Sequence, residues 1–142
     1  MDHVVYLDQK ANEPQKLLSG EKTEIVRGAT GRKLPYGRVF ENDILYFITN
    51  DGSGTVFAKA RVTSVFNSEK LTPEQSNDLL NQHQEKLNLN AAQIKRWGGK
   101  RYLVLIEIAD YETLEPFKID RSAYGNMDDW LPVEDIQTVK QD

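Results

Sequence analysis

The chain contains no cysteine and only two histidines, His3 and His83, which lie far apart in its 142 residues. The absence of cysteine excludes disulfides, thiolate nucleophiles and metal sites with cysteine ligands. A Ser–His–Asp triad would have to use one of two isolated imidazoles. The sequence therefore predicts no metal site and no cofactor.

Long apolar runs are also lacking. No stretch approaches the roughly 20 apolar residues that a helix needs to span a bilayer. The first ten residues, MDHVVYLDQK, have neither a basic leader nor a long apolar segment. The overall content of 39% hydrophobic and 28% charged residues is typical of a globular protein. We expect one cytoplasmic domain over residues 1–142 without membrane attachment, and its oligomeric state is open.

Positive charge is concentrated in two segments, although the formal net charge is -4. Residues 22–38 contain five basic side chains and one acidic side chain. The segment KRWGGKR, residues 95–101, contains four basic side chains and no acidic one. If the two segments meet in the folded protein, they form one focused anion-binding site on an otherwise acidic molecule.

Short apolar and β-branched runs are typical of strands. They predict strands at residues 3–8, 23–28, 43–49, 55–66 and 101–111. Asp51 and Gly52 supply turn chemistry for a hairpin between the third and fourth of these. In the second strand, alternation places Ile25 and Arg27 on one face and Glu24 on the other.

Capping signals predict three short helices. Thr72 and Gln75 form a capping box for a helix over about residues 73–86, and Asn90 and Gln93 repeat the pattern for a shorter helix. In the segment 11–20, Asn12 is expected to cap a helix together with Gln15, with Leu17 and Leu18 pointing inward and Gly20 ending it.

These elements favour an α+β, mainly β fold. Short strands dominate and the helices lie on either side of the central hairpin, which favours an open β-barrel or strongly bent sheet with two or three peripheral helices. Residues 112–142 show weak periodicity apart from a possible edge strand at 116–120. We expect them to form a C-terminal extension that wraps the barrel.

The segment GEKTEIVR resembles the signature of the ASCH domain, a branch of the PUA-like β-barrel superfamily. That signature is usually written G-x-K-x-x-E-x-R, and Gly20, Lys22 and Arg27 match it. Ile25 stands where the signature has Glu, while Glu24 is displaced by one position and so points to the opposite face of a strand. The likeness in element order covers roughly residues 3–110. It implies a PUA-like open barrel with a cleft that binds RNA or a nucleotide-like ligand.

The same resemblance raises the question of catalysis. Some small ASCH proteins are amidohydrolases that remove the acyl group from acetylcytidine, using a Lys and a Thr of this strand and a Glu from the helical region. Ile25 occupies the position of that Thr. The chain therefore matches the catalytic Lys at Lys22 but has no nucleophile at the position that the resemblance implies. The compact catalytic alternative in this chain is Thr23 activated by Lys22, with Glu24 orienting the substrate.

We therefore predict a binding protein, with a small amidohydrolase acting on a modified nucleoside as the alternative and a protein-interaction module as a second alternative. Arg27 either grips a phosphate or forms a structural ion pair with Glu24 or Glu107. Trp97 either stacks on a base or anchors its helix, and Tyr124 and Trp130 either line the cleft or cover the core. The predicted binding residues are Lys22, Thr23, Arg27, Arg32, Lys33, Arg38, Trp97, Lys100 and Arg101.

Overall fold

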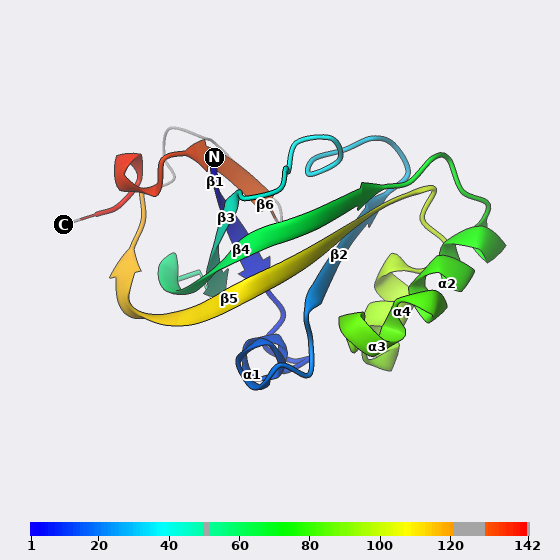
Figure 1. Cartoon of the computed structure of the whole chain (residues 1–142), viewed down its shortest axis with the longest axis horizontal. Coiled ribbons are helices and arrows are strands. Elements are labelled where there is room, and N and C mark those ends of the chain that lie inside the picture. Colours follow the sequence, from blue (N-terminus) through cyan, green and yellow to red (C-terminus); the bar gives the residue numbers. More distant parts are fainter. Residues whose placement is uncertain (50–51, 121–129, 142) are drawn as a thin grey trace.

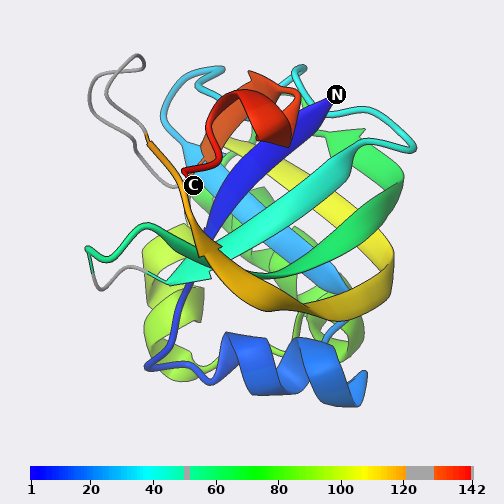
Figure 2. The same ribbon diagram turned by 90° about the vertical axis from the view of Figure 1, so that its left-hand side faces the viewer.

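The structure is a computed structural model that describes residues 1–49, 52–120 and 130–141. Its centre is a strongly curved six-stranded sheet in the spatial order β2-β5-β4-β3-β1-β6 (Figures 1 and 2). The strands are β1 (Asp2–Leu7), β2 (Glu24–Ala29), β3 (Ile44–Thr49), β4 (Thr55–Asn67), β5 (Tyr102–Lys118) and β6 (Trp130–Glu134). The helices are α1 (Glu13–Ser19), α2 (Pro73–Gln82), α3 (Gln84–Leu87), α4 (Ala91–Trp97) and the 3-10 helix η2 (Ile136–Thr138).

The curvature comes from the two longest strands. β4 and β5 pair in antiparallel fashion, and their register shifts at three places. Asp110, within β5, has a left-handed backbone with φ 58°. Such irregularities bend a strand and increase its twist, so the sheet curls into a half-barrel instead of lying flat. The half-barrel stays open between its two edge strands, β2 and β6.

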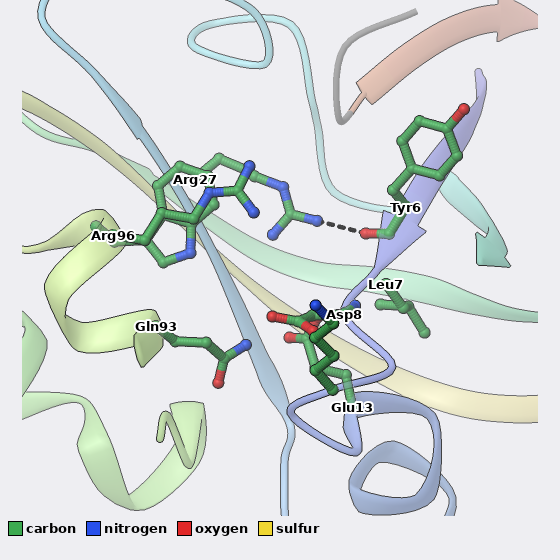
Figure 3. Close-up of a pocket in the computed structure, with 9 residues that line it drawn as sticks. Tyr6, Leu7, Asp8, Glu13, Arg27, Gln93 and Arg96 are labelled. Atoms are coloured by element: carbon green, nitrogen blue, oxygen red, sulfur yellow. Dashed lines mark hydrogen bonds between the residues drawn. The ribbon is translucent and has the colours of Figure 1, made fainter. Parts of the chain in front are cut away.

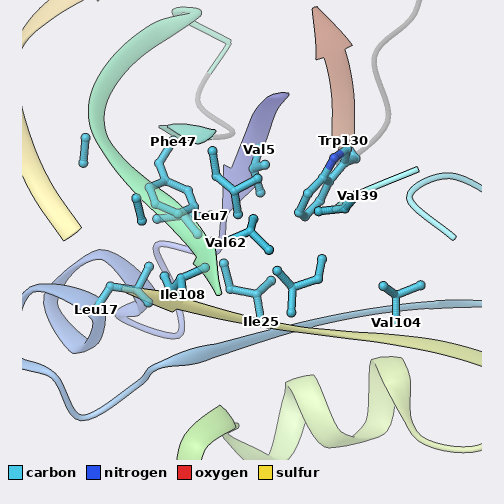
Figure 4. Packing of buried hydrophobic residues seen from close by; sticks show 14 residues of the cluster. Val5, Leu7, Leu17, Ile25, Val39, Phe47, Val62, Val104, Ile108 and Trp130 are labelled. Carbon is cyan, nitrogen blue, oxygen red and sulfur yellow. The ribbon is translucent and has the colours of Figure 1, made fainter. Parts of the chain in front are cut away.

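Alternating side chains fill the concave side of the half-barrel (Figure 4). Ala58, Ala60 and Val62 of β4 belong to this cluster, whereas Val56 packs in a second cluster with Val4 and Ile48. All four are at most 1% exposed, which confirms the predicted hairpin pattern. Ile25 of β2 points into this interior, where it joins the first cluster.

Helices α2, α3 and α4 cover the other face of β2 and β5 (Figure 1). Val26 of β2 packs there against Leu80, Leu87 and Trp97. β2 is therefore buried on both faces, with the alternation that the sequence predicts.

Both predicted capping boxes of the helical layer are present. Thr72 with Gln75 begins α2, and Asn90 with Gln93 begins α4. The single helix predicted over 73–86 is divided, because α2 ends at Gln82 and the short α3 follows after His83.

Two predictions for the first helix are wrong. Asn12 has a left-handed backbone with φ 56°, and its side chain makes no capping hydrogen bond. The Glu13 carboxylate instead accepts a hydrogen bond from the N–H of Asp8, at 2.7 Å. Leu17 is buried as predicted, but Leu18 is 66% exposed, because α1 presents only one face to the sheet.

The C-terminal part of the chain adds to the sheet. β5 extends to Lys118 because its second half continues to pair with β4, so the strand predicted at 116–120 is largely the end of β5. β6 pairs in antiparallel fashion with β1. Tyr124 lies outside the described residues. Within the described ranges, no helix has both the length and the apolar composition to cross a membrane.

Candidate ligand-binding cleft

Two cavities adjoin at the open side of the half-barrel. The first, of about 220 Å³, lies where the end of β1 and the start of α1 approach α4 (Figure 3), and it is lined by Tyr6, Leu7, Asp8, Lys10, Glu13, Arg27, Gln93, Arg96 and Trp97. The second, of about 240 Å³, is lined by Arg27, Gly28, Lys33, Leu34, Pro35, Arg96, Trp97, Lys100 and Trp130. They share Arg27, Arg96 and Trp97, which therefore form the boundary between them. We call the two cavities together the cleft.

Arg27 bridges the open side of the half-barrel. Arg27 extends from β2 and is 7% exposed. Its guanidinium donates a hydrogen bond to the carbonyl of Val26 at 2.8 Å. It donates another to the carbonyl of Tyr6 in β1 at 2.6 Å (Figure 3). The guanidinium carbon also lies 5.6 Å from the ring centre of Trp97 and 5.8 Å from that of Trp130. A guanidinium suits this position because it combines directed N–H donors with stacking on aromatic faces.

The two cavities differ in charge. Arg27, Lys33, Arg96 and Lys100 line the second cavity, and no carboxylate belongs to its described lining. The first cavity is mixed, because Asp8 and Glu13 face it together with basic side chains. The second cavity is therefore the part of the cleft that favours an anion.

The local sequence explains how the two basic segments meet. α4 ends at Trp97, and Gly99, with φ 80°, turns the chain toward β5. Lys100 then crosses over β2 at Gly28, where a Cβ atom would lie only 3.2 Å from the Cβ and Cγ of Lys100. Glycine at this position leaves the space for Lys100 to reach the second cavity.

Both tryptophans of the chain contribute to the core and to the cleft. Trp97 is 7% exposed, packs in the helical layer and carries the guanidinium of Arg96 at 4.3 Å from its ring centre. Trp130 is 2% exposed and belongs to the core cluster of the half-barrel while lining the second cavity. Each tryptophan therefore both packs in a hydrophobic cluster and lines the second cavity, so the structural role and the cleft position do not exclude each other.

Lys22 lies behind the first cavity and lines neither cavity. Its ammonium donates a hydrogen bond to the carbonyl of Leu87 at 2.5 Å and lies 3.4 Å from the carboxylate of Glu13. Burial lowers the pKa of Lys22 to about 8, against the opposing effect of Glu13. Lys22 therefore reaches the cleft only through Glu13, which lines the first cavity.

The proposed catalytic partners of Lys22 are separated from the cleft as well. Thr23 is exposed, and Glu24 is buried beneath the helical layer, where its carboxylate lies 2.8 Å from Nδ1 of His83. Burial raises the pKa of Glu24, although His83 opposes this shift. Glu107 lies opposite Glu24 in the β2–β5 register and accepts hydrogen bonds from Lys86 and Ser64. The two carboxylates meet, but not in the cleft.

The structure thus gathers four of the predicted binding residues around the second cavity: Arg27, Lys33, Trp97 and Lys100. Arg32 instead lies over the rings of Tyr36 and Tyr102, at 5.9 and 5.6 Å. Arg38 and Arg101 are exposed and line neither cavity.

Several lining residues were not predicted. Arg96 belongs to the basic segment KRWGGKR and was recognisable there by its charge. Asp8, Glu13 and Gln93 have no local signal, because Gln93 serves a capping box and the other two stabilise the turn into α1. Among the described residues, no three histidine or carboxylate side chains are arranged to hold a metal ion.

The fold and the cleft define a half-barrel domain with a basic cavity at its open side. No protein-family model matches the chain, and no curated protein matches its sequence. Among solved structures, an ASCH protein from Zymomonas mobilis is similar with a TM-score of 0.65 at 16% identity, covering 99% of this chain and 96% of that chain.

Two further solved structures have a similar fold. A point mutant of the Zymomonas mobilis ASCH protein has a TM-score of 0.68 at 15% identity, covering 96% of this chain and 93% of that chain. The N-terminal domain of McrB from Staphylothermus marinus has a TM-score of 0.52 at 13% identity, covering 97% of this chain and 92% of that chain. The chain therefore has an ASCH-like fold, which confirms the barrel that the signature predicted.

The close approach at Gly28 predicts a specific loss of stability. In Gly28→Ala, the new Cβ atom would lie 2.8 Å from Cδ2 of Leu103 as well as against Lys100, so both side chains must shift. We expect urea denaturation to show a loss of about 1–3 kcal/mol in the free energy of unfolding. The matched control is Gly31→Ala, because Gly31 has no neighbour within 4 Å of its Cβ position. Equal effects of the two substitutions would contradict the packing described here.

The buried Lys22 predicts a pH dependence of stability. Burial lowers the pKa of Lys22 to about 8 in the folded chain, whereas its ordinary value, which applies to the unfolded chain, is 10.5. Between these values the unfolded chain binds more protons, so the Lys22 contribution to the free energy of unfolding rises with pH. We expect a rise on the order of 2 kcal/mol by about pH 10, relative to the double variant Glu13→Gln/Lys22→Met. Parallel urea-midpoint curves for the two proteins would show that Lys22 titrates normally.

Proposed function

We propose that the protein binds single-stranded RNA or a nucleotide-like ligand in the cleft, with a phosphate in the second cavity. The observation that carries this proposal is the lining of that cavity, where four cationic side chains from two distant segments surround a space flanked by two tryptophans. Phosphate groups supply the anion, and bases supply the flat surfaces that aromatic and guanidinium groups stack on.

The geometry of Trp97 suggests how a base would be held. Arg96 already covers one face of its indole, with the guanidinium 4.3 Å from the ring centre. Arg96 is itself exposed, so a base can stack on the guanidinium plane while Trp97 supports it from behind. This arrangement favours a nucleotide over an inorganic anion, because phosphate alone would not use the aromatic wall.

The first cavity supplies polar groups for the rest of the ligand. The side-chain oxygen of Gln93 accepts a hydrogen bond from the N–H of Asn90, which leaves its NH₂ group to donate. Asp8 faces the same space and supplies acceptor oxygens. Typical small-molecule pockets measure about 300–1,000 Å³, and the two adjoining cavities reach that range only together.

The overall charge restricts this binding to the cleft. With a formal net charge of -4, the rest of the surface repels a polyanion, so few phosphates are contacted at once. We therefore expect binding of short single strands or single nucleotides rather than of long duplexes.

Removing two cations of the second cavity tests the proposal directly. Lys33→Ala/Lys100→Ala should weaken the binding of a fluorescent RNA oligonucleotide by about tenfold. The plot of log affinity against log salt should also become shallower by about one to two units, because each phosphate contact contributes about 0.7 for a single strand. Fluorescence anisotropy over a series of salt concentrations measures both quantities.

The matched control is Lys70→Ala/Lys118→Ala, which removes the same charge from two exposed lysines that line neither cavity. Equal weakening by both pairs would show that binding follows net charge and not the cleft. Wild-type binding that does not depend on salt would reject a phosphate in the second cavity.

The amidohydrolase alternative rests on Lys22. A buried lysine with a pKa of about 8 is suited to act as a base near neutral pH. However, its ammonium donates a hydrogen bond to the carbonyl of Leu87, and Ile25 is fully buried in the core where the family likeness would place the nucleophile.

We expect no release of acetate when the pure protein is incubated with acetylcytidine. Turnover of acetylcytidine that Thr23→Ala abolishes would establish the hydrolase instead. A different result would favour the protein-interaction module, namely a pulldown with this protein that retains other proteins but no nucleic acid.

A further inference from the structure

His3 connects a buried hydrogen-bond network to the cleft. It lies in β1 and is fully buried. Its Nε2 lies 2.8 Å from the carboxylate of Asp43, and its Nδ1 accepts a hydrogen bond from the indole N–H of Trp130 at 3.0 Å. The same indole lines the second cavity and stacks with the guanidinium of Arg27.

These two contacts determine where the imidazole carries its proton. The indole nitrogen of Trp130 is only a donor, so the Nδ1 that faces it must be without a proton. The Asp43 carboxylate is an acceptor when ionised, so the Nε2 that faces it must carry one. His3 is therefore neutral, with its single proton on Nε2.

A second proton on His3 would break the contact with the cleft. It would bind at Nδ1 and place two N–H donors against each other where 3.0 Å now separates donor and acceptor. Trp130 would then lose its one described side-chain hydrogen bond, while its backbone still pairs with Val5 of β1. Protonation of His3 would therefore act on the Trp130 indole and not on the backbone pairing of β6 with β1.

We propose that His3 is a positioning residue of the cleft: its neutral imidazole fixes the Trp130 indole as a wall of the second cavity, and protonation of the imidazole releases that wall. This inference rests on the proposed function for its effect on ligand binding. The link between His3 and Trp130 stands on the two hydrogen bonds alone.

The charged groups around His3 act in opposite directions. Asp43 favours the protonated imidazole, as does Asp2 at a greater distance, whereas the amino group of Met1, 3.5 Å from Asp43, disfavours it. Leu45 and Pro132, the partners of His3 in register on β3 and β6, carry no charge. Arg27 lies beyond the indole and adds further positive charge on that side. Burial outweighs the attraction of Asp43, so the pKa of His3 lies below its usual value of 6.5.

Nuclear magnetic resonance of the ¹⁵N-labelled full chain tests the link without any ligand. The ring nitrogens of His3 and the indole N–H of Trp130, assigned with Trp130→Phe, are followed from about pH 8 to about pH 4.5 while the protein stays folded. We expect Nδ1 of His3 to be unprotonated near neutral pH, and His3 and the Trp130 indole to change with one shared midpoint. A protonated Nδ1 near neutral pH, or a Trp130 indole that does not follow the His3 titration, overturns the proposal.

Two substitutions separate positioning from simple packing. His3→Asn keeps an acceptor oxygen at the δ position but does not titrate, whereas His3→Leu removes the acceptor. The Trp130 resonance should stay near its wild-type position in His3→Asn at all pH values and move in His3→Leu. Identical spectra for the Trp130 indole in the two variants would contradict the proposal. If either variant fails to fold, the wild-type titration decides.

The effect on binding is measured with an RNA oligonucleotide that lacks terminal phosphates, because its phosphodiesters do not titrate in this range. Wild-type affinity should fall about fivefold across the His3 midpoint, in line with the loss of one hydrogen bond. The affinity of His3→Asn should stay constant there. Equal pH dependence in wild type and His3→Asn overturns the role of His3 in binding. Absence of oligonucleotide binding at every pH rejects the proposed function instead, and the spectra still decide the link between His3 and Trp130.

Discussion

The cleft depends on the position of one guanidinium group. The sheet is open between β2 and β6, and in the part of the chain that the structure describes no ladder of backbone hydrogen bonds joins these edges. Arg27 spans the opening by donating to the carbonyl of Tyr6 in β1 and by lying between the rings of Trp97 and Trp130. Arg27 lines both cavities. A lysine would carry the same charge but lacks the planar fork and the stacking surface that hold these elements together.

The charged residues fall into two groups according to their surroundings. Outside the cleft, polar and charged side chains are matched in pairs: Glu24 with His83 under the helical layer, Lys22 with Glu13 beside α1, and Glu107 with Lys86 at the surface. Such pairs join elements that are distant in the sequence, and in the buried pair Lys22–Glu13 each partner offsets the cost of burying the other charge. Around the second cavity, by contrast, four cations share one space without a carboxylate in the described lining. The charged pairs thus join elements of the fold, whereas the second cavity gathers side chains of one sign around one space.

The departure from the ASCH signature has a physical consequence. Ile25 stands at the position of the signature's glutamate and is fully buried inside the half-barrel. Glu24, one position earlier, points under the helices and pairs with His83. The acidic groups that do face the cleft, Asp8 and Glu13, come from the turn between β1 and α1. Because alternate residues of a strand face opposite sides, the displacement by one residue places the carboxylate of Glu24 under the helices, whereas position 25 faces the core of the half-barrel.

The sequence by itself determined what depends on neighbouring residues. Two capping boxes, the alternation in β4 and the two faces of β2 were predictable, because capping and periodicity act over a few residues. The signature in GEKTEIVR predicted the ASCH-like fold. Only the tertiary structure decided which cations meet, why Lys22 is buried behind Glu13, and how His3 reaches Trp130 across 127 positions of sequence. Those contacts depend on how far the sheet curls and where its open edges face each other, and no local pattern encodes that distance.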